Sequence, residues 1–543
     1  MASKDIYKEL DYVDLVDVNK ASVSINLEEF RLLGIDKVYF SGEFPAIFFK
    51  EIKQFDKSSL REIARIQHLI WNYRKVMFLF VSSPHEVRIY NCSKKPFYYD
   101  APSIQIAREV KKLEIVSETR GALQIVKEIF SRTAVDSGVL WTTDNKLRLK
   151  IDIQHRLDRY LVSSLLKTAK ELKNLGLDEE IIHCLLMRSI FIMYLEDKGA
   201  AKETNLYSEI KENANSYFDI LEDKTATYKL FRKVEDHFNG NVFPLIKNEE
   251  KKVTDTHLDI IKKCLIDGDI SDVPRLFGPW RLFRFEIIQI EFLSEIYENF
   301  LTEFKGKKKG ETGQYYTPPS LVELILNEKL KFKNEINWNF KILDPACGSG
   351  IFLVESFKRL IKRWKNAHPN TQIEFKNLVN ILENNIFGIE LDKFSLRVTA
   401  FSLYLAIVEQ LNPKTLWIDK SRKFPFLIKD DFDKSLERQG NNLFRADTIG
   451  DISTDNFTKV DLVIGNPPFG ANIKQKSIKR FCEEHKFGQD LVIPFLRKSI
   501  EFTKKGTVAL IFNTKVLTNT EGPFQNFRKW LFKENFVEKI YNF

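Results

Sequence analysis

The strongest constraint on the fold lies in the second half of the chain, where short apolar runs alternate with longer amphipathic stretches. "FKIL" (340–343) precedes "GIFLVESFKRLIKRWK" (350–365), and "NIFGIEL" (385–391) precedes "FSLRVTAFSLYLAIVEQL" (394–411). This alternation is typical of βαβ units, in which consecutive strands lie parallel. It predicts an α/β fold with a mostly parallel sheet wrapped by helices, and ligands at the carboxyl ends of its strands.

Two other regions differ in pattern from this one. Strand-like runs such as "KVMFLFV" (75–81) and a helical stretch indicate an α/β domain over residues 1–145. Residues 150–310 are almost entirely helical in pattern, and the Gly- and Lys-rich "FKGKKKGETGQ" (304–314) resembles a linker. The sequence therefore predicts three domains, the last over 311–543.

Composition narrows the class of protein. Hydrophobic residues make up 43% and charged residues 29%, which is typical of a globular protein. The 84 Lys and Arg against 75 Asp and Glu give a net charge of +9, which is compatible with nucleic-acid binding. Five scattered cysteines without a CxxC pair argue against disulfides and zinc, and the most apolar stretch is broken by Arg188. We expect a cytoplasmic protein without a membrane span.

Polar residues stand where the predicted strands end. "DPACGSG" (344–350) follows one strand, and its Gly348 and Gly350 would let a backbone loop approach a ligand closely. Glu390 ends the next strand, where a carboxylate can bind ribose hydroxyls, and Asp447 could accept a hydrogen bond from an adenine amine. Each feature alone is also explained by a tight turn or a solvated strand end. Since the chain lacks GxxxxGK[ST], the set favours a ligand with ribose and adenine but no phosphates, S-adenosyl-L-methionine.

The order of the motifs resembles the gamma class of N6-adenine DNA methyltransferases found in Type I modification subunits and Type IIG restriction–modification enzymes. The resemblance covers about residues 311–543 and implies a Rossmann-like S-adenosylmethionine-dependent methyltransferase sheet. An all-α domain and an N-terminal α/β nuclease-like domain would precede it. The matching stretches are "TGQYYTPPSLVELIL" (312–326, motif X), "DPACGSG" (344–350, motif I), "GIELD" (388–392, II), "RAD" (445–447, III), "NPPF" (466–469, IV) and "GQDLVIPFLRKSIEFTKKGTVALIF" (488–512, V and VI).

The resemblance also implies roles for single residues. The side-chain oxygen of Asn466 and the carbonyl of Pro467 would accept the hydrogens of the target amine, with Pro468 fixing the turn. Phe469, where the family usually has Tyr, would stack on a base taken out of the duplex. Thr317 is expected to cap a helix with Pro318 at its first position. The implied cofactor-binding residues are Tyr316, Thr317, Pro318, Asp344, Ala346, Gly348, Gly350, Glu390 and Asp447.

The N-terminal region leaves two interpretations open. Type IIG enzymes place a PD-(D/E)xK nuclease there, and Asp36, Glu51 and Lys53 have a plausible spacing for its Mg²⁺ site. Aligning "FPAIFF" instead puts Phe49 where the acid should be. We favour a degenerate nuclease-like domain without a metal site.

The functional prediction is a site-specific adenine-N6 DNA methyltransferase of a restriction–modification or related defence system. Gamma-class enzymes continue past the motif VII region, where this chain stops at Phe543, into a hairpin and a target-recognition domain. A separate specificity polypeptide could supply both, or the gene could be a truncated remnant. The expected partners are double-stranded DNA and that polypeptide. Methylation of RNA or of a protein glutamine, and a non-catalytic scaffold, stay as alternatives.

Overall fold

The chain forms two compact units. A computed structural model describes residues 7–20, 27–42, 44–96, 112–116, 120–139, 142, 156–201, 204–238, 244–270, 281–304, 317–412, 416, 422–433, 438–452, 460–468, 476–503 and 505–542, a few of them by backbone alone. Unit 1 comprises Met1–Thr168 and Asp259–Gln289, and unit 2 comprises Ala169–Leu258 and Ile290–Phe543. The division into three domains stays a prediction, and the structure is described below as these two units.

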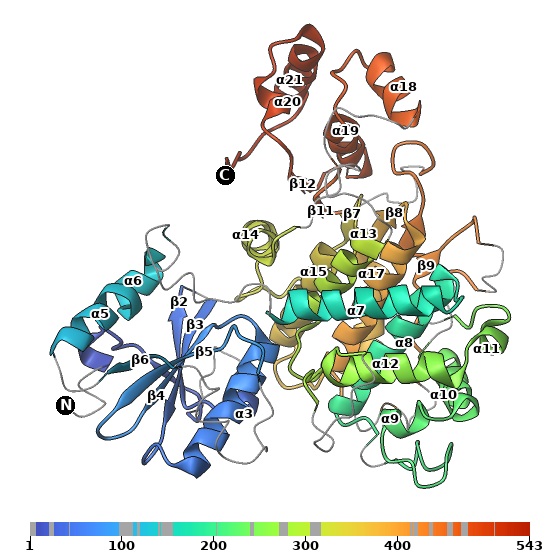
Figure 1. Cartoon of the computed structure of the whole chain (residues 1–543). Helices are drawn as coiled ribbons and strands as arrows, with labels where there is room; N and C mark the ends of the chain where they lie inside the picture. The colour runs from blue at the N-terminus through green and yellow to red at the C-terminus, as the bar shows by residue number, and fades with distance from the viewer. Residues whose placement is uncertain are drawn as a thin grey trace. The chain divides into compact units, whose positions relative to one another are not determined.

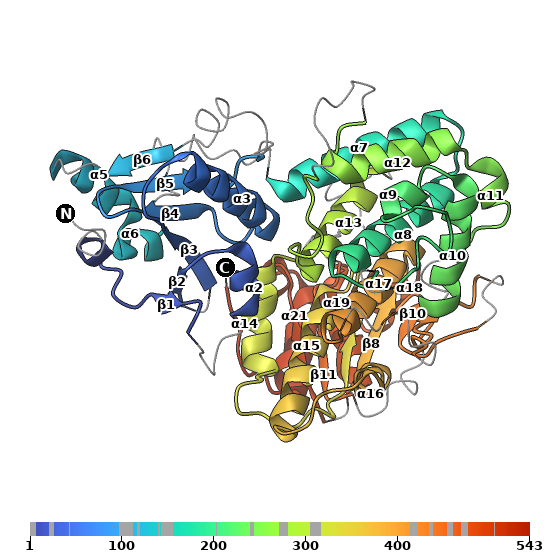
Figure 2. The ribbon, with the colours of Figure 1, turned by 90° about the horizontal axis from the view of Figure 1, so that it is seen from below.

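Unit 1 is built on a six-stranded sheet (Figure 1). Its strands follow chain order from β1 to β6 (Figure 2). Neighbouring strands are antiparallel, except that β3 and β4 are parallel and joined through α3. The elements are β1 (Val16–Asp17), α2 (Glu28–Leu33), β2 (Lys37–Ser41), β3 (Phe44–Glu51), α3 (Lys57–Tyr73), β4 (Phe78–Ser82), β5 (Val87–Asn91), β6 (Lys112–Val116), α5 (Arg120–Phe130), α6 (Arg132–Asp136) and the start of α7 (Leu157–Asn174).

Strand β3 shows how this sheet separates two cores. Successive side chains of a strand point to opposite faces, and Phe48 and Phe49 accordingly belong to different apolar clusters. Phe48 packs with residues of α2 and α3. Phe49 packs with Tyr7, Phe80 and Phe130. Apolar side chains therefore fill both faces of the sheet.

Unit 2 combines a helical part with a second six-stranded sheet (Figure 2). Its helices before the sheet are α8 (Glu179–Asp197), α9 (Tyr217–Ile220), α10 (Lys224–Phe238), α11 (Glu249–Lys252), α12 (Asp255–Asp267, shared with unit 1), α13 (Ile290–Phe304) and α14 (Pro319–Lys329). The sheet region contains β7 (Ile342–Asp344), α15 (Ile351–Ala367), α16 (Phe375–Asn385), β8 (Ile386–Glu390), α17 (Lys393–Glu409), β9 (Ile428–Lys429), β10 (Leu443–Arg445), β11 (Leu462–Gly465), α18 (Lys476–Glu484), α19 (Val492–Phe502), β12 (Thr507–Leu510), α20 (Lys515–Thr518) and α21 (Gly522–Glu534).

All strand pairs of this second sheet are parallel, in the order β12-β11-β7-β8-β10-β9. Strands β7 and β11 are buried along their whole length, as parallel strands covered on both faces must be. Helix α17 is buried from Leu396 to Val408 and packs on α13, α15 and β10. The predicted parallel sheet wrapped by helices is confirmed.

The strand order fixes where a ligand belongs. From β7 the chain proceeds through β8 to one side of the sheet, and it later returns through β11 and β12 to the other side. A crevice opens at such a reversal, outside the carboxyl ends of the two central strands. Here those strands are β7 and β11, which run into "DPACGSG" and "NPPF". Within the described part of the chain, no helix is long and apolar enough to cross a bilayer.

Candidate active site

The two central strands meet at a contact that only glycine permits. Asp344 ends β7 and Gly465 ends the neighbouring β11. A β-carbon on Gly465 would lie 2.5 Å from Asp344 Oδ1, closer than any real contact. Gly465 thus makes room for the first carboxylate of the turn, a requirement that the sequence analysis did not identify.

The turn after β7 uses its two predicted glycines differently. Gly348 has a φ of +55°, and a β-carbon there would meet only Glu298 Oε1, at 3.9 Å. Gly350 has a φ of +86°, and its β-carbon would lie 2.5 Å from Thr399 Cγ2 on α17. Gly348 therefore leaves an open side along the turn, as close approach of a ligand requires. Gly350 also lets α15 begin tight against α17, a packing role that the sequence did not reveal.

Glu390 connects the end of β8 to the same turn. Its Oε2 accepts a hydrogen bond from Gly348 N at 3.0 Å, and its Oε1 accepts one from Asp392 N at 2.8 Å. Burial raises the pKa of the Glu390 carboxyl. Burial also raises the pKa of the Asp344 carboxyl to about 8, and the negative charge of Glu390 acts in the same direction. Asp344 Oδ1 accepts from Ala346 N at 3.0 Å, which holds the start of the turn.

A third carboxylate, Glu298 of α13, was missed by the sequence analysis. Its Oε2 accepts a hydrogen bond from Ser349 Oγ at 2.6 Å, and removal from water raises its pKa. The sequence around Glu298 indicates only an amphipathic helix. The signal that could have revealed this residue is an acidic side chain among apolar neighbours. Asp344, Glu390 and Glu298 thus each accept a hydrogen bond from a residue of the turn, namely Ala346, Gly348 and Ser349. Three partly or fully buried carboxylates at one backbone turn fit a cationic ligand, because a nearby positive charge favours their ionised form.

Asp447 lies after β10, and its carboxylate accepts hydrogen bonds from two residues of unit 2. Its Oδ1 accepts from Ile449 N at 3.0 Å, and its Oδ2 accepts from Ser477 Oγ of α18 at 2.7 Å. The neighbouring Thr448 donates to the carbonyl of Pro345 at 2.5 Å. These bonds join the ends of β7 and β10 and bring α18 to the same rim. Ser477 is another residue that local patterns did not reveal.

Asn466 follows β11 directly and is tied to the predicted motif X segment. Its Nδ2 donates a hydrogen bond to Thr317 Oγ1 at 3.0 Å. The expectation that Thr317 caps a helix is wrong, because α14 begins at Pro319 and the N-cap position belongs to Pro318. Pro467 is buried and Pro468 is partly buried.

Two predicted site residues, Tyr316 and Phe469, lie outside the described residues. The roles predicted for the described site residues, with the correction for Thr317, stay predictions.

The candidate metal residues of unit 1 are bound by neighbours. Asp36 Oδ2 accepts from Glu51 N at 2.7 Å, and Lys50 Nζ lies 3.4 Å from Asp36 Oδ1. Glu51 pairs with Lys37 at 2.5 Å, whereas Lys53 is exposed. Over the described ranges, the structure groups no three His, Cys, Asp or Glu side chains in a way that could hold a metal ion.

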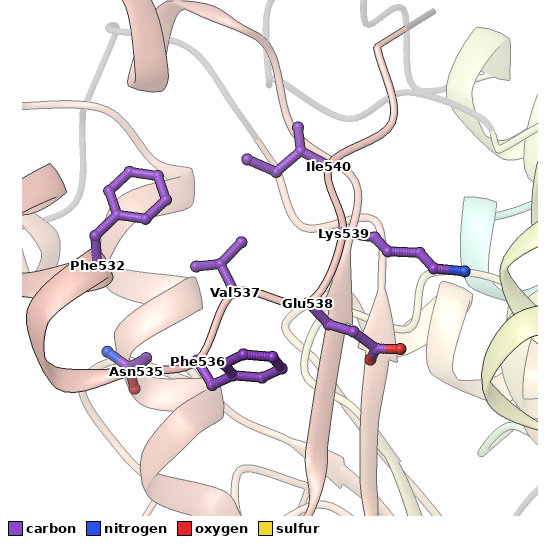
Figure 3. Close-up of a pocket in the computed structure, with 7 residues that line it drawn as sticks. All are labelled: Phe532, Asn535, Phe536, Val537, Glu538, Lys539 and Ile540. Carbon is purple, nitrogen blue, oxygen red and sulfur yellow. The ribbon is translucent and has the colours of Figure 1, made fainter.

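A shallow depression of about 440 Å³ lies at the C-terminal end of the described chain, lined by Phe532 and residues 535–540 (Figure 3). Its lining contains none of the predicted site residues. Glu538 and Lys539 point away from Phe532 and pair with Lys329 and Glu328 of α14, so these contacts hold the segment on that helix.

Comparison of the sequence with known proteins points to DNA methyltransferases. The profile of the family "N-6 DNA Methylase" matches residues 288–543. The type II restriction enzyme and methyltransferase RM.Eco57I of Escherichia coli is 22% identical over 86% of this chain and 49% of its own length. The type II methyltransferase M.BstVI of Geobacillus stearothermophilus is 28% identical over 39% of this chain and 35% of its own length. The type I restriction enzyme MjaIX methylase subunit of Methanocaldococcus jannaschii is 23% identical over 51% of this chain and 46% of its own length.

This chain spans about half the length of the first of these relatives and less than half of the other two. The matched region begins just before α13, which carries Glu298, and it includes the glycine turn, Glu390, Asp447 and Asn466. Residues 288–543 of this chain thus match the N-6 DNA methylase family, and the three relatives are by name restriction–modification methyltransferases or a methylase subunit.

Proposed function

We propose that this chain methylates the N6 amine of adenine in double-stranded DNA with S-adenosylmethionine, within a restriction–modification or related defence system. One observation carries the proposal. The side-chain amide of Asn466 stands at the reversal point of a parallel sheet, beside a glycine turn whose residues donate hydrogen bonds to three carboxylates. A site of that kind combines a place for a cationic cofactor with acceptors for a neutral amine.

The glycine turn fits the proposed cofactor. S-adenosylmethionine, when bound, supplies a methyl group on a positively charged sulfonium. The open side of Gly348 would receive it, and Glu390 would lie beside the ribose hydroxyls. Asp344 and Glu298 would add negative charge around the turn, and their raised pKa values would fall as that positive charge arrives.

Asn466 and Pro467 would prepare the amine. An adenine amine is a poor nucleophile, because its nitrogen lone pair is delocalised into the ring. The Asn466 side-chain oxygen and the Pro467 carbonyl can each accept one N–H, which draws the nitrogen toward a pyramidal shape and frees its lone pair. Proline locks φ, so this carbonyl keeps its direction. The rate would come from positioning and electrostatics, and the surplus proton of the methylated amine would leave along these acceptors.

Partners are part of the proposal. One relative is by name a methylase subunit, so we infer that a separate specificity polypeptide supplies target recognition. The isolated chain is then expected to bind DNA weakly and without sequence preference. Site-specific methylation by the purified chain alone would contradict this part of the proposal.

The test is transfer of tritium from labelled S-adenosylmethionine to DNA, RNA or protein, with DNA at high concentration. We expect label in DNA, recovered as N6-methyladenine. Asn466→Ala should lower the rate by about 10²- to 10³-fold, the usual effect of losing one preorganised polar group. Its cofactor affinity, measured by titration calorimetry, should stay within about twofold. Asn384→Ala, the same change at an exposed helix position, is the matched control.

Two results would contradict the proposal. Label in RNA or protein but not in DNA would change the substrate class. Full activity of Asn466→Ala would remove the mechanism.

A further inference from the structure

The hydrogen bond between Asn466 and Thr317 joins two segments that are 149 residues apart. Asn466 Nδ2 is the donor and Thr317 Oγ1 the acceptor, at 3.0 Å. Thr317 is only 6% exposed, so water competes little for its hydroxyl. The contact lies within unit 2, at the amino end of α14 and the carboxyl end of β11.

The same local sequence stands on both sides of this bond. Thr317 is followed by Pro318 and Pro319, and Asn466 is followed by Pro467 and Pro468. A residue that precedes proline is restricted to extended backbone conformations, and proline itself has a fixed φ. Both partners of the bond are therefore held by stiff backbone. Little conformational freedom is lost when the bond forms, and the amide is held in one place.

The direction of an amide matters for the proposed chemistry. One branch of the Asn side chain carries two donors and the other carries an acceptor oxygen. With Nδ2 bound to Thr317, Oδ1 occupies the opposite branch. If the amide turned over, N–H groups would face the N–H groups of the substrate amine, and an acceptor would be lost. An unpaired buried polar group costs about 1–3 kcal/mol, enough to change a rate by one to two orders of magnitude.

We propose that Thr317 is a positioning residue that orients the Asn466 amide, so that its oxygen faces the substrate amine. The role rests on the function proposed above and gives Thr317 a task other than holding the cofactor. It also links the segment that begins α14 to the one that carries the chemistry.

The kinetic test compares Thr317→Val, which keeps the shape but not the hydroxyl, with Thr317→Ser, which keeps the hydroxyl. Thr317→Val should lower kcat by about 10- to 100-fold and leave KM for S-adenosylmethionine within about twofold. Thr317→Ser should recover activity to within about threefold of the parent. Thr518→Val, the same change at an exposed position of α20, is the control.

Full activity of Thr317→Val would overturn the inference, and so would a loss confined to KM. Equal loss in the Ser and Val variants would do the same. These outcomes differ from failure of the proposed function, which shows as full activity of Asn466→Ala.

A second measurement does not depend on activity. Thermal unfolding of Thr317→Val, Asn466→Ala and the double variant forms a double-mutant cycle. A Tm shift in the double variant clearly smaller than the sum of the single shifts supports the contact. Additive shifts overturn it.

Discussion

The carboxylates at the strand ends differ between the two units, although each unit is built on a six-stranded sheet. In unit 1, Asp36 and Glu51 at the strand ends face Lys50 and Lys37, and the Glu51 side chain is 46% exposed. In unit 2, Asp344 and Glu390 are buried and held by main-chain N–H groups.

Unit 2 also buries a complete ion pair, Arg188 with Glu249, in its helical part. Glu249 additionally accepts from Tyr228 and from the N–H of Ile246, and Arg188 lies over the ring of Phe231. The comparison teaches that a carboxylate near lysines at the surface is already neutralised by its own chain. A buried carboxylate held by neutral donors can still respond to a cation that binds later.

The largest expected effect tests the buried pair. Glu249→Ala leaves Arg188 buried without its counter-charge, and removing one partner of a buried pair costs about 3–5 kcal/mol. Glu250 is the matched control, because it is the next residue and also pairs with an arginine, Arg232, but at the surface. Glu250→Ala should cost less than about 1 kcal/mol. Denaturant unfolding measures both changes, and equal losses would break the comparison.

The second effect concerns pH and Asp344. Its pKa is about 8 in the folded chain against an ordinary value of 3.8, so the folded state keeps a proton that the unfolded state loses. Its contribution to stability is therefore complete below the ordinary pKa and declines as the pH rises toward about 8. The slope is at most about 1.4 kcal/mol per pH unit.

Asp344→Asn cannot titrate and should lose this slope. The test is to measure the unfolding free energy of the parent and of the variant between about pH 5 and 8. Parallel curves for the two proteins would contradict the buried state of this carboxyl.

The smallest effect is expected in unit 1. Glu51→Ala removes a pair with Lys37 in which both side chains are partly exposed, so stability should change by about 0–1 kcal/mol. Methyl transfer should stay at the level of the parent, because Glu51 belongs to the other unit. A Mg²⁺-dependent DNA cleavage that disappears in Glu51→Ala would instead make this residue a metal ligand.

Local patterns predicted the sheet of unit 2 well. The alternation of apolar runs and helices gave parallel strands, and the special residues after "FKIL" and "VDLVIG" stand at the carboxyl ends of two adjacent central strands. Each of those signals occupies a few consecutive residues, so the sequence displays it directly. The family resemblance read from these motifs is confirmed as well.

The contacts between distant segments could not be predicted from the sequence. Glu298 binds Ser349, 51 residues away, and Thr317 binds Asn466, 149 residues away. The local hydrophobic pattern of a segment does not reveal which distant segment it packs against. The wrong prediction for the helix cap at Thr317 has a cause that is visible in the local sequence. Pro318 precedes Pro319, which pushes Pro318 into an extended conformation with a ψ of 136°, so the helix cannot start before Pro319.

The closeness of Gly465 to Asp344 sets a practical rule for anyone who mutates the stretch around Asn466. Randomised libraries spanning that stretch should leave position 465 fixed, since even alanine would push the neighbouring acid out of place. An altered substrate range in the selected variants could then be assigned to the residues that follow β11, and not to a disturbed contact between β11 and β7.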